Sequence, residues 1–481
     1  MSRFVRCFAP LLVCCLAGCP EKSTVQRPAE LPLADQMVEI LAPVDLALRE
    51  SWEPLLEEWR AQTGGNVMWT EFPAENPPWR SGAELSTAPN GGRVVLVALP
   101  ELGDAESQGF LTPLPASVVE QVDKKDILPG LKAAALSRQK RLVALPVSAP
   151  VLLCYYRKDL LEAAGRTPPQ TWDEYQTLIN DLPQWTPGLS AQEPCGPEFL
   201  ASLFLARSAA YAKHPQNYSV WFDIQTGEPL FNSPAFEHAL GDAREAWSQM
   251  PAEIWTATPA DCRRELLAGR AAMILSFEPA SAYPRPAAGL ETEATATDPL
   301  PIGVCRLPGS RKIYQRDANR WAAITTADPH QPGLVGFSGL VMGATANSER
   351  AAAWNLLQLL AERTDAAFAD RPRSVCRESE SLTGFGSGEL SAETESLLTD
   401  ATAETLRRLD TVCDFSLPAA GPLRQIIAEE LGSSAKTERE SEVILTAIQG
   451  RLVQATQDRR DAIRDSYRRS VGLAPAKPAT P

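Results

Sequence analysis

The chain has 481 residues, with 60 Asp and Glu against 46 Lys and Arg and a formal net charge of −14 at pH 7. This acidic balance argues against nucleic-acid binding, which needs a basic face to neutralise phosphates. The length is sufficient for two or more domains with a large core. After the first nineteen residues, no segment comes near the roughly 20 apolar residues of a membrane-spanning helix, so we expect a soluble body.

The N-terminus has the pattern of a bacterial export signal. Arg3 and Arg6 precede an apolar stretch over 8–16, which at about nine residues is too short to cross a bilayer. The tetrapeptide 16–19, Leu-Ala-Gly-Cys, resembles a lipobox, in which small residues precede the cysteine that takes a lipid. We therefore predict a signal peptide over 1–18 and a lipid anchor on Cys19. The alternative is a secretory peptide that leaves Cys19 as a thiol.

Residues 19–35 contain three prolines and mixed charges without apolar periodicity, which predicts a flexible tether. Six cysteines follow in the mature chain, and an even number in an oxidising compartment permits three disulfides. Fifteen pairings are possible and buried unpaired thiols are the alternative, so the connectivity stays open. None of the six forms a C-x-x-C pair, so we expect no zinc or redox site. The six are Cys154, Cys195, Cys262, Cys305, Cys376 and Cys413.

The first half of the mature chain alternates strand and helix signals. Apolar residues recur at helical spacing over about 45–60, with Asp45 as a candidate cap. The continuous apolar run 93–99 is typical of a strand buried on both faces. Strands alternating with helices predict a parallel α/β sheet. The predicted strands are 38–41, 66–70, 93–99 and 142–147, with helices starting near 45 and 101. In the middle of the chain, where the pattern differs, 151–156 is predicted as a strand and a short helix starts near 158.

The remainder of the chain is richer in helix. Thr171 is expected to cap one helix, and Ser233 with Pro234 to open another. The stretch 281–300, rich in Pro, Ala and Thr, predicts a loop, and 473–481 a disordered tail. Further predicted helices are 198–213, 233–249, 262–268, 348–362 and most of 392–467, and further strands are 271–276 and 334–342.

Short motifs occur in a recognisable order. The most specific stretch joins Leu145-Pro146-Val147-Ser148, the strand 152–156, Arg157-Lys158-Asp159-Leu160 and the segment 168–174. Weaker strings are 41–64, 100–114, 267–273, 348–360 and 467–470. Together, over roughly 36–472, they resemble the extracellular solute-binding proteins of ABC importers. The closest pattern is the family 1 group that includes maltose- and glycerol-3-phosphate-binding proteins. The stretch 281–300 and the long helical region from about 392 depart from that pattern.

The resemblance implies an α/β fold of two lobes, the type II periplasmic-binding-protein-like architecture, with a helical C-terminal region. Lobe 1 would comprise 36–148 plus about 302–363, and lobe 2 would comprise 149–301 plus about 364–472. Hinge segments are expected near 148–153, 303–307 and 361–364.

The resemblance also implies a function. The chain would be a monomer that binds a sugar or polyol by lobe closure, without a cofactor or metal. It would deliver the solute to an ABC permease with separate ATPase subunits. Its expected place is the periplasmic or other extracytoplasmic face of a membrane, to which the lipid anchors it.

The site can also be predicted without the family. In open α/β sheets, ligands bind beyond the carboxyl ends of the strands, and residues at those ends are Asp45, Glu71, Glu101, Ser148, Phe277 and Glu278. Aromatic faces pack against the C–H faces of sugars, and aromatics outside helical stripes are Trp69, Trp221, Trp255, Trp321 and Phe337. Asp45 and Glu101 could instead stabilise helix starts. Tryptophans on helical stripes are expected in the core, namely Trp52, Trp59, Trp172, Trp247 and Trp354.

Two rival functions remain. An exported glycosidase or esterase would need a general base or a matched carboxylate pair, but the chain has only three histidines. The string 336–339 lacks the second glycine of a nucleophile elbow, because Leu340 follows. The string 384–388 lacks the strand and lysine of a phosphate-binding loop. We therefore expect no catalytic residues. The second rival, a lipid-anchored binding protein for sensing or scaffolding, has the same sequence features as transport.

Overall fold

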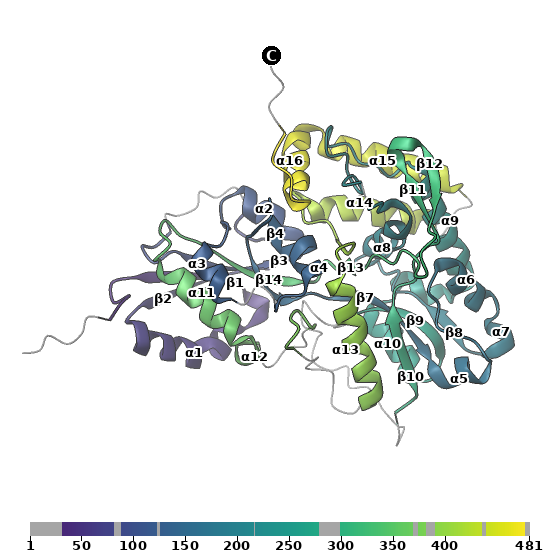
Figure 1. The fold of residues 1–481 in the computed structure, drawn as a ribbon, viewed down its shortest axis with the longest axis horizontal. Helices are drawn as coiled ribbons and strands as arrows, with labels where there is room; N and C mark the ends of the chain where they lie inside the picture. Colours follow the sequence, from purple (N-terminus) through teal and green to yellow (C-terminus); the bar gives the residue numbers. More distant parts are fainter. Residues whose placement is uncertain are drawn as a thin grey trace, which may run out of the picture.

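The computed structural model describes residues 31–80, 88–122, 126–215, 217–278, 299–368, 374–380, 390–434 and 439–476. The predicted signal peptide, Cys19 and the glycine-rich string 384–388 lie outside the described residues, as do residues 281–298 of the predicted loop. Within the described chain, the strands form two main sheets (Figure 1).

The first sheet has the strand order β2-β1-β3-β14-β6. Its first three strands are parallel, as the alternating pattern predicts, while β14 runs antiparallel to both of its neighbours. The strands are β1 (Met37–Pro43), β2 (Asn66–Phe72), β3 (Arg93–Ala98), β6 (Leu145–Ser148) and β14 (Leu340–Thr345). The helices of this lobe are α1 (Leu48–Thr63), α2 (Leu102–Ser107), α3 (Ala116–Gln121), α4 (Pro129–Leu131), α11 (Ala352–Glu362) and α12 (Thr364–Ala367).

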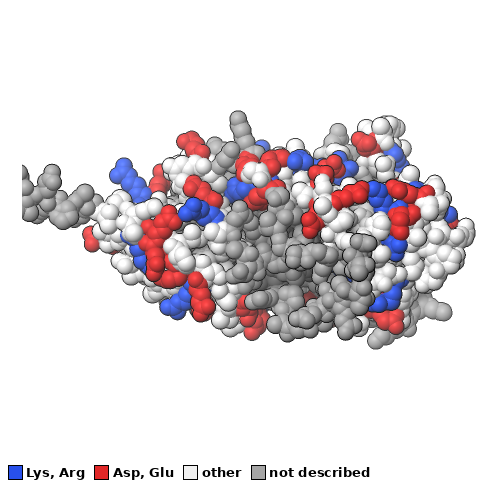
Figure 2. Space-filling model, turned by 90° about the horizontal axis from the view of Figure 1, so that it is seen from below, with Lys and Arg blue, Asp and Glu red and all other residues white. Residues whose placement is uncertain are grey.

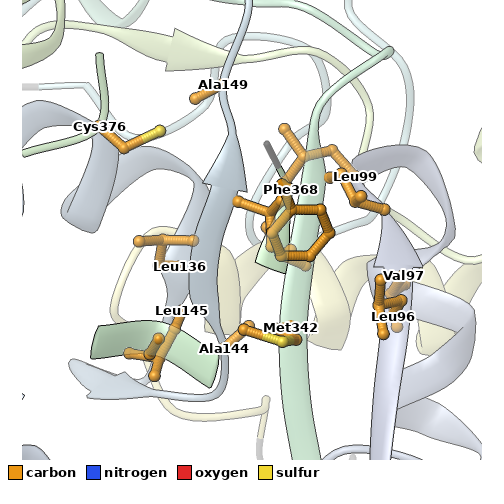
Figure 3. Close-up of a cluster of buried hydrophobic side chains, with 14 of the residues drawn as sticks. Leu96, Val97, Leu99, Leu136, Ala144, Leu145, Ala149, Met342, Phe368 and Cys376 are labelled. Atoms are coloured by element: carbon orange, nitrogen blue, oxygen red, sulfur yellow. The ribbon is translucent and has the colours of Figure 1, made fainter. Parts of the chain in front are cut away.

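The core of this lobe is built around β14. Figure 3 shows Met342 between the strand that carries Leu96 and the strand that carries Leu145, with Phe368 above it. Met342, Leu96 and Leu145 have no exposed surface. Burial on both faces explains why these strands are continuous apolar runs rather than alternating patterns.

The second sheet has the order β15-β13-β7-β9-β8, and β10 pairs with β7 beside this path. Its central strand β7 runs antiparallel to β9 and to β10, whereas β8 pairs with β9 and β13 with β15 in parallel, so this sheet is mixed. The strands are β7 (Val151–Arg157), β8 (Ser190–Gln192), β9 (Ala271–Glu278), β10 (Ile302–Arg306), β13 (Leu334–Val335) and β15 (Val412–Cys413).

Helices surround the second sheet, and the C-terminal region is helical as predicted (Figure 1). A hairpin of β11 (Lys312–Gln315) and β12 (Arg320–Ala323) lies on the helices of this lobe. A smaller hairpin of β4 (Ser137–Arg138) and β5 (Arg141–Leu142) belongs to the first lobe. The helices are α5 (Lys158–Ala163), α6 (Trp172–Asn180), α7 (Leu182–Trp185), α8 (Leu200–Ala212), α9 (Pro234–Ser248), α10 (Pro259–Leu267), α13 (Ala392–Arg407), α14 (Ala420–Ser434), α15 (Ser441–Thr456) and α16 (Arg460–Ser470).

Two short crossings of the described chain connect the lobes, and the chain passes between them a third time between α12 and α13, where part of it lies outside the described residues. Ala149-Pro150 joins β6 to β7, and residues 336–339 join β13 to β14. The single strand predicted over 334–342 is therefore two strands in different sheets. The chain crosses between the sheets through a closely packed segment, and Gly336 and Gly339 leave no room there for a side chain. A Cβ on Gly336 would lie 2.7 Å from the Phe277 ring, and one on Gly339 would lie 2.3 Å from Leu99 Cδ1.

The topology corrects the expected return of the chain to lobe 1 at about 302. β10 and β13 both belong to the second sheet, and the β11–β12 hairpin contacts α8 and α9 of that lobe. The chain re-enters the first sheet only at β14. The hinge expected at 303–307 therefore lies within a strand of the second sheet, and the hinge expected at 361–364 joins α11 to α12, which contact each other.

Both expected flexible ends are shorter than predicted. Leu33 N donates to Thr63 O at 2.8 Å, so the last residues of the predicted tether pack on α1. At the other end, Arg468 Nε donates to Ala474 O at 2.7 Å and Ala476 N donates to Asp465 Oδ1 at 3.1 Å. Asp45 caps no helix, because Ala47 occupies the N-cap position of α1.

A buried ion pair organises the helices of the second lobe. Arg207 Nη2 lies 2.6 Å from Glu193 Oε1, and these side chains are 1% and 0% exposed. Tyr175 Oη and Trp247 Nε1 also donate to this carboxylate at 2.9 and 2.8 Å. The Arg207 guanidinium stacks 4.1 Å from the centre of the Trp172 ring. Residues from α6, α8 and α9 therefore meet on one carboxylate.

We expect Glu193→Gln to lower the free energy of unfolding by about 3–5 kcal/mol, because Arg207 would stay buried without a compensating charge. The matched control is Glu228→Gln. Glu228 pairs with Arg460 at 3.4 Å and is 52% exposed, so this loss should be at most about 1 kcal/mol. Urea denaturation followed by circular dichroism measures both. Equal losses in the two variants would contradict the role assigned to the pair.

Candidate functional site

The crossings bring the ends of strands from both lobes together. Gly336 N donates to Pro150 O at 2.7 Å, and Leu99 N donates to Gly339 O at 2.8 Å. A third contact joins α2 to the loop before α14, because Asp104 Oδ2 accepts from Ala419 N at 3.0 Å. The C-terminal ends of β3 and β9 therefore lie near the same crossing, because Gly336 approaches Phe277 and Gly339 approaches Leu99, as expected for ligand sites at strand ends.

The first lobe contributes Trp79, Arg80 and Glu101 to this region. Trp79 Nε1 and Arg80 Nε both donate to Glu101 Oε2 at 3.0 Å, and a second guanidinium nitrogen of Arg80 pairs with Glu101 Oε1. Trp79 is buried between Phe72 and Phe110, with ring centroids 5.3 and 5.5 Å away. Arg80 is 39% exposed, so it is the part of this group that a solute can reach.

The second lobe and the crossing contribute an aromatic row that ends on an arginine. Phe199 lies 6.3 Å from Phe277 and 5.4 Å from Phe337, measured between ring centroids. Arg424 on α14 stacks 3.7 Å from the centre of the Phe337 ring. The Arg80 group of the first lobe approaches the aromatic row at α14. A Cβ on Gly421 of that helix would lie 3.6 Å from Arg80 Nη2. Phe199 and Phe337 are partly exposed.

Arg424 is held by a buried network. Its Nε lies 3.2 Å from Asp414 Oδ2, and its Nη2 donates to Glu198 O at 2.7 Å and Ser202 Oγ at 3.0 Å. Ser202 Oγ in turn donates to Asp414. Burial lowers the pKa of Arg424, and the Asp414 carboxylate opposes that shift. The guanidinium keeps its charge, because an arginine starts from a pKa above 12.

The chemistry of the cluster favours a neutral, hydroxyl-rich solute. Each arginine already has a carboxylate partner, so neither cation requires an anionic ligand. The remaining N–H groups and carboxylate oxygens can exchange hydrogen bonds with hydroxyls. Partly exposed phenylalanine rings can pack against C–H faces.

Some of the predicted site residues meet here and others do not. Glu101, Phe277 and Phe337 belong to the cluster. Ser148 is buried at the crossing, and its Oγ has no hydrogen-bond partner among the described residues. Glu278 is the register partner of Val151 at the end of β9. Asp45 and Glu71 are exposed at the ends of β1 and β2, and the structure gives them no contact with the cluster.

The predicted tryptophans lie elsewhere. Trp221 is 4% exposed and contacts Phe236 and Phe415 in the core of the second lobe. Trp255 packs against Trp247 with ring centroids 5.4 Å apart. Trp321 lies on the β11–β12 hairpin against Tyr211, His238 and Tyr314. Trp69 packs on Trp52. The five tryptophans expected in the core are all buried, at Trp52, Trp59, Trp172, Trp247 and Trp354.

Four residues of the cluster were missed from the sequence. Trp79 and Arg80 come several residues after the end of β2, beyond the strand-end rule. The dipeptide Pro77-Pro78 before them marks an ordered turn and was a usable signal. Phe199 immediately precedes α8, and Arg424 lies within α14. Nothing in a helical pattern distinguishes an arginine that stacks on a distant ring such as Phe337 from an arginine that points into solvent.

The described surface carries mixed charge. On the face shown in Figure 2, acidic and basic side chains are interspersed over both ends of the molecule. Among the described residues, no group of three or more His, Cys, Asp or Glu side chains could hold a metal ion. In the same residues, no helix has the length and apolar character needed to cross a bilayer.

No disulfide joins the six cysteines of the described chain. Cys154 and Cys305 are register partners across β7 and β10. The contact with Cys305 and burial raise the pKa of Cys154, and burial also raises that of Cys195. The sequence allowed either disulfides or thiols at these positions, and the structure has no disulfide among them.

A family model described as bacterial extracellular solute-binding protein matches residues 62–370. This match covers more than half of the chain, so the chain belongs to the bacterial extracellular solute-binding proteins. Membership places it outside the cytoplasm, among binding proteins rather than enzymes.

Solved structures agree on the fold. Maltose-bound MalE3 of T. maritima is 18% identical with a TM-score of 0.55, over 87% of this chain and 100% of that one. The sugar-binding protein MalE of Xanthomonas citri is 17% identical with a TM-score of 0.60, over 88% and 98%. An ABC transporter solute-binding protein of Agrobacterium radiobacter K84, in complex with ribitol, is 16% identical with a TM-score of 0.54, over 88% and 100%. The fold is the two-lobe α/β architecture of these proteins.

We expect Arg424→Met to lower the free energy of unfolding by about 3–5 kcal/mol, because the Asp414 carboxylate, 1% exposed, would lose its counter-charge. Arg424→Lys should recover part of that loss, since it restores the charge without the planar stack on Phe337. Chemical denaturation of the two variants measures the difference. An Arg424→Met protein as stable as the parent would show that the network does not hold α14 in place.

Proposed function

We propose that this chain is the solute-binding lipoprotein of an ABC importer and captures a neutral sugar or polyol between its lobes. The observation that carries the proposal is the cluster at the crossings, where aromatic rings and paired charges from both lobes meet. Arg80 and Glu101 would bind hydroxyls from one side, and Arg424 from the other. Phe199 and Phe337 would pack on the apolar faces of the solute.

Capture would proceed by rotation of the lobes about the two crossings. A solute that touches both lobes makes its full set of contacts only when they are closed, so it shifts the equilibrium toward the closed state. The closed form would dock on a membrane permease, and a separate ATPase would drive release. Maltose and ribitol, the ligands bound in two similar structures, are the first solutes to test.

Anchoring through a lipid on Cys19 is the second part of the proposal. The lipobox-like tetrapeptide supports it. The linker from Cys19 to Leu33, whose backbone is tied to α1, would hold the body within a few nanometres of the membrane, on the order of 5–6 Å × √n for a flexible chain. This proximity raises the effective concentration of the protein at its permease.

The binding proposal is tested by titration calorimetry of residues 20–481 with maltose, ribitol and D-mannitol. At least one should bind, and Phe337→Ala and Arg80→Gln should each weaken that binding by about tenfold or more, equivalent to about 1.4 kcal/mol. Trp255→Ala is the matched control and should leave affinity unchanged, because Trp255 packs against Trp247 away from the cluster. Absence of heat and of any thermal shift with all three solutes would remove the sugar or polyol assignment.

The anchor is tested by expressing the full chain with labelled palmitate. The parent should carry label and remain in the membrane fraction, whereas Cys19→Ser should lose both, because the serine cannot form the thioether to the lipid. Cys376→Ser serves as a control for cysteine loss elsewhere. Label that persists in the Cys19→Ser protein would contradict the assigned position.

A further inference from the structure

A second cavity lies between the lobes, apart from the cluster at the crossings. Its volume is about 470 Å³, which is in the range of small-molecule sites. The first lobe lines it with α4, the turn that follows and the β4–β5 hairpin. The second lobe lines it with α16 and the segments around Tyr218 and Val412. None of Trp79, Arg80, Glu101, Phe199, Phe277, Phe337 and Arg424 borders it.

The walls are mainly apolar and aromatic. Val220, Trp221 and Phe415 are buried in the inner wall, while Leu409 and Tyr218 are 74% and 51% exposed. Exposed large apolar side chains at a cavity indicate a surface that binds apolar groups. Three hydroxyls of the lining have partners within the protein. Thr411 Oγ1 donates to Thr405 O, Ser470 Oγ to Tyr467 O, and Tyr467 Oη to Tyr218 O.

Three lysines from both lobes complete the lining. Lys132 and Lys140 come from the first lobe and Lys213 from the second. The side chain of Lys140 lies over Gly472, where a Cβ would be 3.3 Å from its Cγ. No ion pair or side-chain hydrogen bond of these three ammonium groups occurs among the described residues. Burial lowers the pKa of Lys213, and the Asp410 carboxylate opposes that shift without forming an ion pair with the ammonium.

The lining has a single acidic residue, Asp414. Its carboxylate is already occupied, because it forms an ion pair with Arg424 and accepts hydrogen bonds from Ser202 Oγ and the Phe415 backbone N–H. The lining therefore combines an apolar interior with three lysines that form no ion pair among the described residues, and its one carboxylate is already paired. In a chain of net charge −14, a local group of three unpaired lysines contrasts with the rest of the molecule.

We propose that this cavity is a second ligand site, which binds a small amphipathic anion whose apolar body packs against Trp221 and Val220 and whose acidic group pairs with Lys132, Lys140 and Lys213. Charge complementarity distinguishes this ligand from the neutral solute of the first site. Because the lining comes from both lobes, the occupant contacts both and holds one arrangement of them in preference to others.

The test uses anilinonaphthalene sulfonate, an aromatic sulfonate whose fluorescence rises when it leaves water, with the chain of residues 20–481 at low salt. The dye should bind at one saturable site, and decanoate should displace it at lower concentration than decanol, which has the same chain length without the charge. Lys132→Gln, Lys140→Gln and Lys213→Gln should each weaken dye binding by about threefold or more. Lys158→Gln, on α5 and paired with Glu393, is the matched control and should bind as the parent does.

A cavity-filling variant separates the cavity from the exposed surface. Ala134 is partly exposed in the lining, so Ala134→Trp can occupy the space without disturbing the core, and a parent-like melting curve verifies the fold. It should abolish saturable binding. Dye binding that survives in a folded Ala134→Trp protein, or that is unchanged when all three lysines are replaced, would overturn the proposal. The outcome is independent of sugar binding, since maltose should not displace the dye.

Discussion

The arrangement of this protein depends on how short its crossings between the two sheets are. Two residues connect β6 to β7 and four connect β13 to β14, and hydrogen bonds from Gly336 to Pro150 and from Leu99 to Gly339 join the crossings to the strand ends. The strand ends of both sheets are thereby held next to each other at the crossings. Side chains that follow the strands must meet there, whichever solute the protein binds.

Pairing of charge determines what each inter-lobe region can recognise. At the crossings, Arg80 is neutralised by Glu101 and Arg424 by Asp414, which suits uncharged hydroxyl-rich molecules. In the second cavity the three lysines form no ion pair among the described residues, and the Asp414 carboxylate pairs with Arg424. This arrangement suits an anion. Asp414 borders both regions, and its use by Arg424 and Ser202 is what leaves the second cavity positive.

Much of the fold could be predicted locally. Apolar periodicity located α1, α9 and α11, the Thr171 cap is present with Glu174 N donating at 3.2 Å, and continuous apolar runs located β3 and β7. The sequence-based predictions fail where one residue pattern is compatible with two different strand pairings. The run 334–342 contains apolar residues suitable for either sheet, and only the close packing of Gly336 and Gly339 divides it. Likewise β10 has a strand pattern that does not specify its partner, and pairing with β7 moved it into the second lobe.

The amino-acid sequence by itself determined the export signal pattern, the α/β class and the family, because these depend on local composition and on the order of short motifs. It also located Glu101, Phe277 and Phe337, which lie at strand ends or at the glycine-flanked crossing. Only the tertiary structure decided that Trp221 packs in a hydrophobic core and that Arg80 and Arg424 belong to the cluster at the crossings. The physical reason is that segments far apart in the chain bring these side chains together, since Arg424 stacks on Phe337 and Gly421 of α14 approaches Arg80. Such contacts leave no periodic trace in the chain.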